Sequence, residues 1–206
     1  GLRYQQLLQY VQPHDTSKEA FRIIDADFVN TSDGTGLVHL APTFGADDFN
    51  VAQKRGLPLM LVEDSNKNLV PLVNLNGQFI DGLGEFSKRF VKAEFNESEK
   101  QSVDIDIVVK LKQDGLIFKS EKYEHNYPHC WRTDKPILYY PLDSWFVRST
   151  EYRDLMIKKN NEINWKPKST GEGRFKNWLE NINDWNLSRS RFWGIPLPIW
   201  KNADGS

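Results

Sequence analysis

Short runs of apolar and β-branched residues, separated by Gly and Asn, mark the first ninety residues of the chain. Segments 20–29 (AFRIIDADFV) and 36–42 (GLVHLAP) are rich in strand-forming residues and flank the turn sequence NTSDGTG, which predicts a hairpin-like pair. The apolar run at 57–62 (LPLMLV) predicts a buried strand, and residues 68–86 predict further short strands. This part of the chain is therefore predicted to be β-rich.

Residues 46–56 (ADDFNVAQKRG) have the charge pattern of a short helix instead. The first turn is acidic, the last turn carries Lys54 and Arg55, and Gly56 is a typical stop signal. Within 98–115 apolar residues recur at helical spacing before a glycine, which predicts a second helix.

The rest of the chain alternates between extended and helical patterns. Residues 116–149 are rich in aromatic and β-branched residues and are broken by prolines, so they predict extended ribbons. Two further helices are predicted near 151–160 (EYRDLMIKKN) and 173–182 (GRFKNWLENI). The segment 194–200 (GIPLPIW) contains two prolines that exclude a helix.

These elements predict an α+β protein in three parts. Residues 1–97 form a β-rich part, residues 98–124 a helix and a connecting strand, and residues 125–206 ribbons and helices.

The composition predicts a soluble cytoplasmic protein. Of the 206 residues 39% are hydrophobic and 27% charged, enough to bury one ordinary core or two small ones. No apolar run approaches the length of a membrane span, no signal-peptide pattern occurs, and the single cysteine, Cys130, excludes an intrachain disulfide. The net charge is −1, but residues 151–206 carry 10 Lys/Arg against 7 Asp/Glu. The start at Gly1 and the polar tail lead us to expect an excised piece of a longer chain.

Candidate chemistry gathers in residues 34–49 (GTGLVHLAPTFGADDF). His39 ends an apolar run, and Asp47 and Asp48 fall in the first turn of the predicted helix. Backbone N–H groups and the helix dipole keep such a carboxylate ionised, so it can bind a cation such as a ligand ammonium. Helix capping, above all by Asp47, is the competing interpretation, as are a buried structural role for His39 and a metal site. The glycines alone predict only a turn.

Three blocks of sequence resemble the isoleucyl-tRNA synthetase family, class I. They are GTGLVHLAPTFGADDF, YPHCWRTDKPILYYPLDSWF and LSRSRFWGIPLPIW, in that order, and the likeness covers nearly the whole chain. The first block is similar to the editing domain inserted into the catalytic domain, and the other two to the return path. The resemblance implies a β-rich, partly open barrel-like editing domain over 1–97, followed by a ribbon-and-helix segment. Valyl and leucyl relatives carry similar GTG-led blocks but usually lack the histidine at position 39.

The resemblance implies hydrolysis of mischarged valyl-tRNA(Ile) by water attack on the aminoacyl ester. One methylene changes binding by only about 1–3 kcal/mol, a limit for which isoleucyl-tRNA synthetases are themselves the standard illustration, so a second site must remove valine. By match to the family motif, Asp48 would anchor the substrate ammonium and His39 would orient the terminal ribose or the water. The implied substrate-binding residues are Gly34, Thr35, Gly36 and Asp47, and the implied tRNA-binding residues are Arg189, Arg191 and Trp193.

Several family features are missing from the sequence. Neither His-x-Gly-His nor Lys-Met-Ser-Lys-Ser occurs, so activation with ATP and Mg²⁺ is expected only of the full-length enzyme. The threonine-rich segment of the editing pocket is also absent, which leaves the pocket half encoded. Thr133 stands where some relatives place a second cysteine after Cys130, so no cofactor or metal site is expected here.

The expected partners are the 3′ end of a mischarged tRNA(Ile) and the remainder of the synthetase chain, with no membrane contact. Three alternatives remain open: a non-catalytic module that contacts tRNA, a valyl- or leucyl-type editing domain, and a metal-dependent hydrolase using His39, Asp47 and Asp48. For Arg189 and Arg191, a structural role in bridging domains is an almost equally good interpretation.

Overall fold

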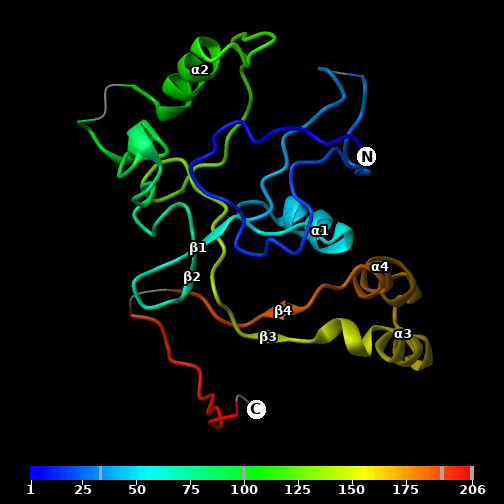
Figure 1. The fold of residues 1–206 in the computed structure, drawn as a ribbon. Helices are drawn as coiled ribbons and strands as arrows, with labels where there is room; N and C mark the ends of the chain where they lie inside the picture. The colour runs from blue at the N-terminus through cyan, green and yellow to red at the C-terminus, as the bar shows by residue number, and fades with distance from the viewer. Residues whose placement is uncertain (33, 99–100, 191–192, 205–206) are drawn as a thin grey trace. The chain divides into compact units, whose positions relative to one another are not determined.

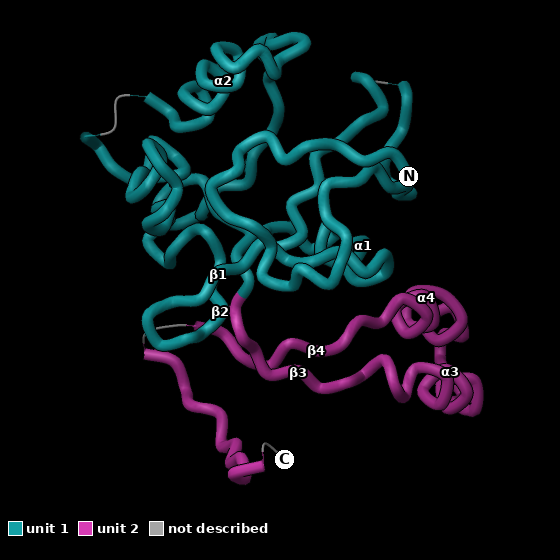
Figure 2. Tube along the Cα trace, viewed as in Figure 1, with its two compact units in different colours: residues 1–141 teal, residues 142–206 magenta. Residues whose placement is uncertain are grey.

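The computed structural model describes residues 1–32, 34–98, 101–190 and 193–204 (Figure 1). The chain divides into two compact units, Gly1–Pro141 and Leu142–Ser206 (Figure 2). Each unit combines short helices with a two-stranded antiparallel sheet, and neither sheet is closed. The predicted mixture of helix and strand is thus confirmed, whereas the three-part domain division stays a prediction.

The first unit is built around two helices and a β-hairpin. Its regular elements are α1 (Ala46–Arg55), β1 (Leu61–Glu63), β2 (Leu69–Pro71), the 3₁₀ turns η1 (Gly84–Phe86) and η2 (Ala93–Phe95), and α2 (Val103–Gln113). In the hairpin Val62 lies opposite Val70. The Asp64 carboxylate closes the turn by accepting the backbone N–H groups of Asn66 and Asn68, each at 2.8 Å.

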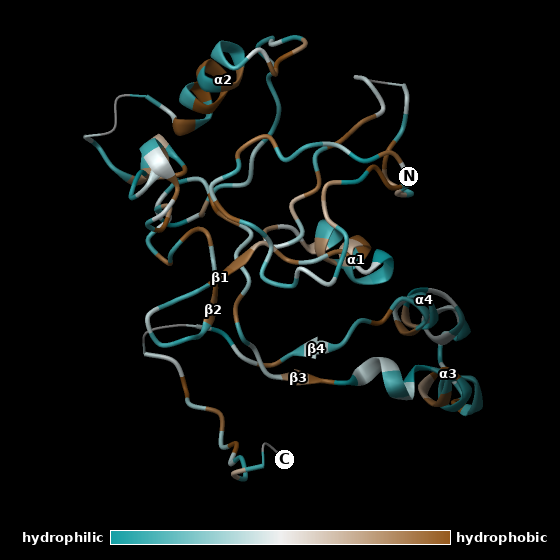
Figure 3. Ribbon diagram, in the orientation of Figure 1, coloured by the Kyte–Doolittle hydropathy of each residue, from teal (hydrophilic) through white to brown (hydrophobic). Residues whose placement is uncertain are grey.

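Helix α1 begins and ends where the sequence predicts. Lys54 and Arg55 occupy the last turn, and Gly56 follows with φ of 64°, the left-handed conformation that favours glycine. Helix α2 is confirmed as well: Ser102 caps it by accepting the backbone N–H of Asp104. Figure 3 shows both helices carrying apolar and polar residues together.

The core of the first unit lies beside α2. Leu83, Phe86 and Val103 are buried together, and the Tyr10 ring meets Phe86 edge-on at 6.1 Å. Each fully buried side chain of this size stabilises the fold by about 1.5–3 kcal/mol.

The predicted pairing of segments 20–29 and 36–42 is wrong. Residues around 22 pair instead with the N-terminal residues: Tyr4 N–H donates to Phe21 O at 2.9 Å and Ile23 N–H to Leu2 O at 2.7 Å. Leu37 and Val38 are exposed and belong to no strand. Strand-forming composition identifies an extended segment but does not select the segment with which it pairs. Segment 36–42 follows directly after the turn, yet it is the N-terminal residues that pair with segment 20–29.

The second unit is a helical hairpin closed by a short sheet. Strand β3 (Phe146–Val147) pairs with β4 (Trp185–Asn186), and between them run η3 (Ser149–Tyr152), α3 (Arg153–Glu162), the π-helical turn η4 (Thr170–Phe175) and α4 (Lys176–Glu180). Both predicted helices are confirmed, and residues 194–200 are not helical. Residues 116–149 are extended as predicted, but they contain little regular strand.

A buried asparagine organises the helical hairpin. Asn160 Nδ2 donates to Gly171 O at 2.9 Å, and Trp165 Nε1 donates to Asn160 Oδ1 at 3.0 Å. The indole lies so close to Gly171 that a Cβ there would fall 2.0 Å from Trp165 Cδ1. A glycine is therefore required at this position by close approach.

None of the helices in the described part of the chain combines the length and apolar character needed to span a bilayer.

Candidate functional site

The loop that leads into α1 and the first turn of this helix together carry six of the nine predicted site residues, and the loop opens with a tight turn. Gly34 and Gly36 have φ of 65° and 72°, and between them the Thr35 hydroxyl accepts the Leu37 N–H at 3.3 Å. A Cβ on Gly36 would approach Thr31 Cγ2 to 3.1 Å. Both glycines are needed for the backbone conformation, as the turn interpretation predicts.

Asp48 holds this loop closed. Its Oδ2 accepts the backbone N–H of Ala41 at 2.8 Å, and the carboxylate lies against Gly45, where a Cβ would come within 3.2 Å of Oδ2. The N-cap is Gly45 in extended conformation, and no side chain caps the helix. The carboxylate is thus fixed by a bond back to the loop rather than to the helix end.

Asp47 behaves differently from its neighbour. Its side chain is exposed, and within the described chain it makes no hydrogen bond or ion pair. The interpretation of Asp47 as a capping residue is therefore wrong. The physical reason is that the turn before α1 places Gly45 at the cap, so Asp47 is already inside the first turn.

His39 lies on the same loop, in an exposed position. Its ring has no hydrogen-bond or ion-pair partner in the part of the chain that the structure describes. Because His39 precedes Ala41 by two residues, its Cα lies within about 7 Å of the residue that Asp48 binds. A buried structural role for His39 is wrong for this structure.

Two residues that sequence reasoning missed fasten the loop to the rest of the first unit. The buried Thr43 hydroxyl accepts the Met60 N–H at 3.1 Å, and the Phe44 ring meets Tyr140 edge-on at 5.9 Å. The Tyr140 hydroxyl donates to Val73 O at 2.9 Å, and burial raises the pKa of this phenol. Their position inside the motif, between Pro42 and Gly45, is the only sequence signal that could have indicated them.

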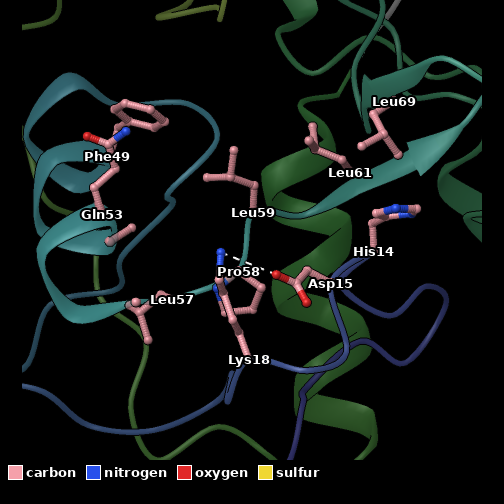
Figure 4. A pocket seen from close by; sticks show the side chains of 12 residues that line it. His14, Asp15, Lys18, Phe49, Gln53, Leu57, Pro58, Leu59, Leu61 and Leu69 are labelled. Atoms are coloured by element: carbon pink, nitrogen blue, oxygen red, sulfur yellow. Dashed lines mark ion pairs between the residues drawn. The ribbon is translucent and has the colours of Figure 1, made fainter.

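A groove of about 470 Å³ lies beside α1 but excludes the predicted site residues (Figure 4). Phe49 and Gln53 of α1 line it together with several leucines, and an ion pair of 3.2 Å between Asp15 and Lys18 lies at its polar side. The pKa of Asp15 is lowered, first by its hydrogen bond from the Ser17 hydroxyl and then by Lys18. Geometry alone would favour this groove, whereas the chemistry of the motif favours the loop. His14 lines the groove beside this ion pair, but none of the residues matched to the family motif does, so the loop is the candidate site.

The predicted tRNA-binding residues lie in the second unit. Arg189 is exposed, and its Nη1 donates to the carbonyls of Asn186 and Ser188 at 3.1 and 2.7 Å. Trp193 is fully exposed, as a stacking residue must be, and Arg191 lies outside the described residues. A role for these residues in tRNA binding stays a prediction.

Cys130 lies at the base of a hairpin turn. Its N–H donates to Lys135 O, and its carbonyl accepts the Asp134 N–H, both at 2.8 Å. The pKa of the thiol is lowered from its ordinary value, first by the hydrogen bond with the Thr133 side chain and then by the neighbouring N–H groups. Among the described residues, no three metal-ligating side chains of the His, Cys, Asp or Glu type come together.

The family can be assigned from comparisons with known proteins. Residues 61–206 match the family model "tRNA synthetases class I (I, L, M and V)", so the chain belongs to the class I tRNA synthetases. It is 52% identical to the isoleucine-tRNA ligase of Cytophaga hutchinsonii and 50% identical to that of Bacteroides fragilis, over 100% of this chain in both cases. The enzyme of Clostridium tetani is 45% identical over 98% of the chain.

The resemblance to isoleucyl-tRNA synthetases is thereby confirmed. The chain spans about a fifth of the relatives' length, 20% for Cytophaga and Bacteroides and 17% for Clostridium.

Proposed function

We propose that this chain supplies part of the editing site of an isoleucine-tRNA ligase, where water hydrolyses the ester of mischarged valyl-tRNA(Ile). Two observations support this function: the family membership of the chain and the position of the Asp48 carboxylate. Asp48 Oδ2 is fixed by the Ala41 N–H, while Oδ1 has no partner within the described chain. A carboxylate held at one oxygen and open at the other is preorganised to accept the α-ammonium that every aminoacyl ester presents.

In this proposal the remaining loop residues position the rest of the substrate. His39 would orient the terminal ribose or the attacking water. The Gly34–Thr35–Gly36 turn would bring backbone close to the substrate, and the exposed Asp47 would contact it from the first turn of α1. An ester is already activated toward attack, so orientation of water supplies the main rate factor. The barrel-like closure implied by the resemblance would be completed by other parts of the editing domain.

We assign the activation reaction of the full-length protein to parts of its chain outside this sequence. Activation of isoleucine with ATP and Mg²⁺ would require the two nucleotide-binding signatures that this sequence lacks. The tRNA 3′ end would be the partner of this chain, with Arg189, Arg191 and Trp193 contacting phosphate and base. We further propose a cytoplasmic location.

The test is deacylation of valyl-tRNA(Ile) by the full-length protein. A charge-assisted contact contributes about 1.5–3 kcal/mol, so Asp48→Ala should lower kcat/KM about ten- to 200-fold while isoleucine activation stays nearly unchanged. His39→Ala should have a smaller effect, because orienting a water matters less than anchoring the charge. An Asp47→Ala variant that lost editing while Asp48→Ala kept it would disprove the assignment.

A second candidate function is a non-catalytic module that contacts tRNA. The observation in its favour is that His39, on the loop, and Asp47, in the first turn of α1, are both exposed and lie outside the groove. This module would be favoured if substitution of His39, Asp47 or Asp48 left the deacylation rate of the full-length protein unchanged. A valyl- or leucyl-type editing site would instead reveal itself by preferring another mischarged tRNA.

We expect the purified protein to contain no stoichiometric zinc, because Thr133 replaces a potential second thiolate near Cys130. Elemental analysis by mass spectrometry would measure this directly. One equivalent of tightly held zinc would contradict the expectation.

A further inference from the structure

A row of aromatic rings runs along the extended segment before the Cys130 hairpin. Its members are Tyr123, His125, Tyr127 and His129, and we call it the aromatic row. Neighbouring ring centroids are 5.8, 6.3 and 6.2 Å apart; the first pair is stacked and the other two are edge-on. Residues two apart on an extended chain share one face, so the alternation in the sequence becomes a continuous row.

One end of the row is fixed and the other is open. The Tyr127 hydroxyl donates to Ile137 O at 2.8 Å, and Lys92 Nζ lies 5.0 Å from the Tyr127 ring centroid. His129 Nδ1 lies 2.9 Å from Tyr127 O. Tyr123, at the far end, is 71% exposed. The row is therefore held in place without being buried.

The turn of the hairpin that follows carries one further exposed aromatic ring. Trp131 is two residues beyond His129 and 85% exposed, and the Arg132 guanidinium lies 4.6 Å from its ring centroid. A β-bridge between His129 and Pro136 closes the hairpin that carries this pair. A stacked arginine and indole present two planar faces to a third planar group.

The charge around these rings is nearly balanced. Residues 116–137 contain four Lys/Arg and three Asp/Glu, and the Lys119 and Glu121 side chains are paired at 2.6 Å. A surface that binds mainly through phosphate charge would have a larger basic excess. What the segment offers instead is exposed ring area at regular intervals.

We infer that the aromatic row and the Trp131–Arg132 pair form a stacking surface for the unpaired bases of a single-stranded RNA segment. Every base has a π-face, so a row of rings binds unpaired bases with little sequence preference, and guanidinium planes stack in the same way. The family supplies the partner, a tRNA, whose 3′ end is single-stranded. The inference rests on the proposed function only for that choice of partner.

The test uses the full-length protein and a short fluorescent single-stranded RNA with the sequence of the tRNA 3′ end, with fluorescence anisotropy as the readout. Loss of one stacking partner should weaken binding about five- to 150-fold, so Tyr123→Ala and Trp131→Ala should each weaken it at least fivefold. The slope of log K against log salt should stay unchanged, because no phosphate contact is removed.

The conservative variants Tyr123→Phe and Trp131→Phe keep a ring and should bind within about twofold of the unchanged protein. Tyr139→Ala is the matched control, since Tyr139 is 58% exposed in the same unit but outside the row. Unchanged affinity of the two Ala variants would overturn the inference, and so would an equal loss in Tyr139→Ala. So would a lowered Tm with unchanged RNA affinity, which would show that the row packs against another part of the full-length protein.

The two proposals fail separately. If RNA binding depends on the row while no variant or condition reveals deacylation of valyl-tRNA(Ile), the proposed function falls and the stacking surface stands. If deacylation depends on Asp48 while the Ala variants of Tyr123 and Trp131 bind RNA normally, the stacking surface is disproved and the proposed function stands.

Discussion

Replacing Asp48 by Asn separates the loop contact that the structure shows from the ammonium binding that we propose for the same carboxylate. Oδ2 accepts the Ala41 N–H at 2.8 Å, which closes the loop, and the negative charge is available to an ammonium. An amide oxygen at the same place can still accept from Ala41 but carries no charge. Asp48→Ala removes both the acceptor and the charge.

The magnitudes follow from the kind of hydrogen bond that is lost. A hydrogen bond to a charged group contributes about 1.5–3 kcal/mol and a neutral one about 0.5–1.5 kcal/mol. Asp48 is only partly buried, so water can replace part of the lost bond and the lower halves of these ranges apply. We expect Asp48→Ala to cost about 1.5–2 kcal/mol of unfolding free energy, and Asp48→Asn about 1 kcal/mol or less. Deacylation should fall about ten- to 200-fold in both variants, because both lose the charge.

Two assays on the full-length protein measure these effects, urea-induced unfolding for stability and single-turnover deacylation of valyl-tRNA(Ile) for editing. Asp27→Asn is the matched control, because Asp27 is an exposed carboxylate of the same unit outside the predicted site, and it should change neither quantity appreciably. Full editing activity in Asp48→Asn would refute the reasoning, since the charge would then not be used. Equal stability of the Asn and Ala variants would show that a neutral acceptor for the Ala41 N–H contributes nothing.

Two further predictions concern the second unit. Gly171→Ala places a Cβ 2.0 Å from Trp165 Cδ1 and should cost about 1–3 kcal/mol by overpacking, whereas Gly173→Ala meets nothing within 4 Å and should leave Tm much less changed in thermal melts. The pKa of Asp184 is lowered in the folded protein, first by the hydrogen bond from the Thr150 hydroxyl and then by that from the Thr150 N–H. The Asp184 carboxylate therefore stabilises the fold at pH values above its pKa in the unfolded chain, and this stabilisation is lost as the pH falls through its pKa in the folded protein. Urea unfolding from pH 7 to pH 2.5 should therefore show a smaller acid-dependent loss for Asp184→Asn, and an unchanged pH profile would contradict this.

The sequence by itself determined those features whose causes are local. Helix α1 begins beside its acidic turn and ends at Gly56, because dipole interactions and glycine's left-handed conformation act within one turn. Local causes also explain α2, which Ser102 caps and Gly115 follows with φ of 71°, and the turn made by Gly34 and Gly36. The motif blocks also predicted the family correctly, since a motif records residue identity without needing the fold.

Only the tertiary structure decided which distant groups meet. Segment 20–29 pairs with the N-terminal residues rather than with 36–42, because strand propensity does not choose between partners. The carboxylate of Asp48 reaches Ala41 seven residues back, and Thr43 reaches Met60. The alternating rings of the aromatic row were present in the sequence, but their contacts arise only because the chain stays extended there. Contacts of this kind depend on loop closure and packing, whose free energies come from the whole chain and not from any short segment of it.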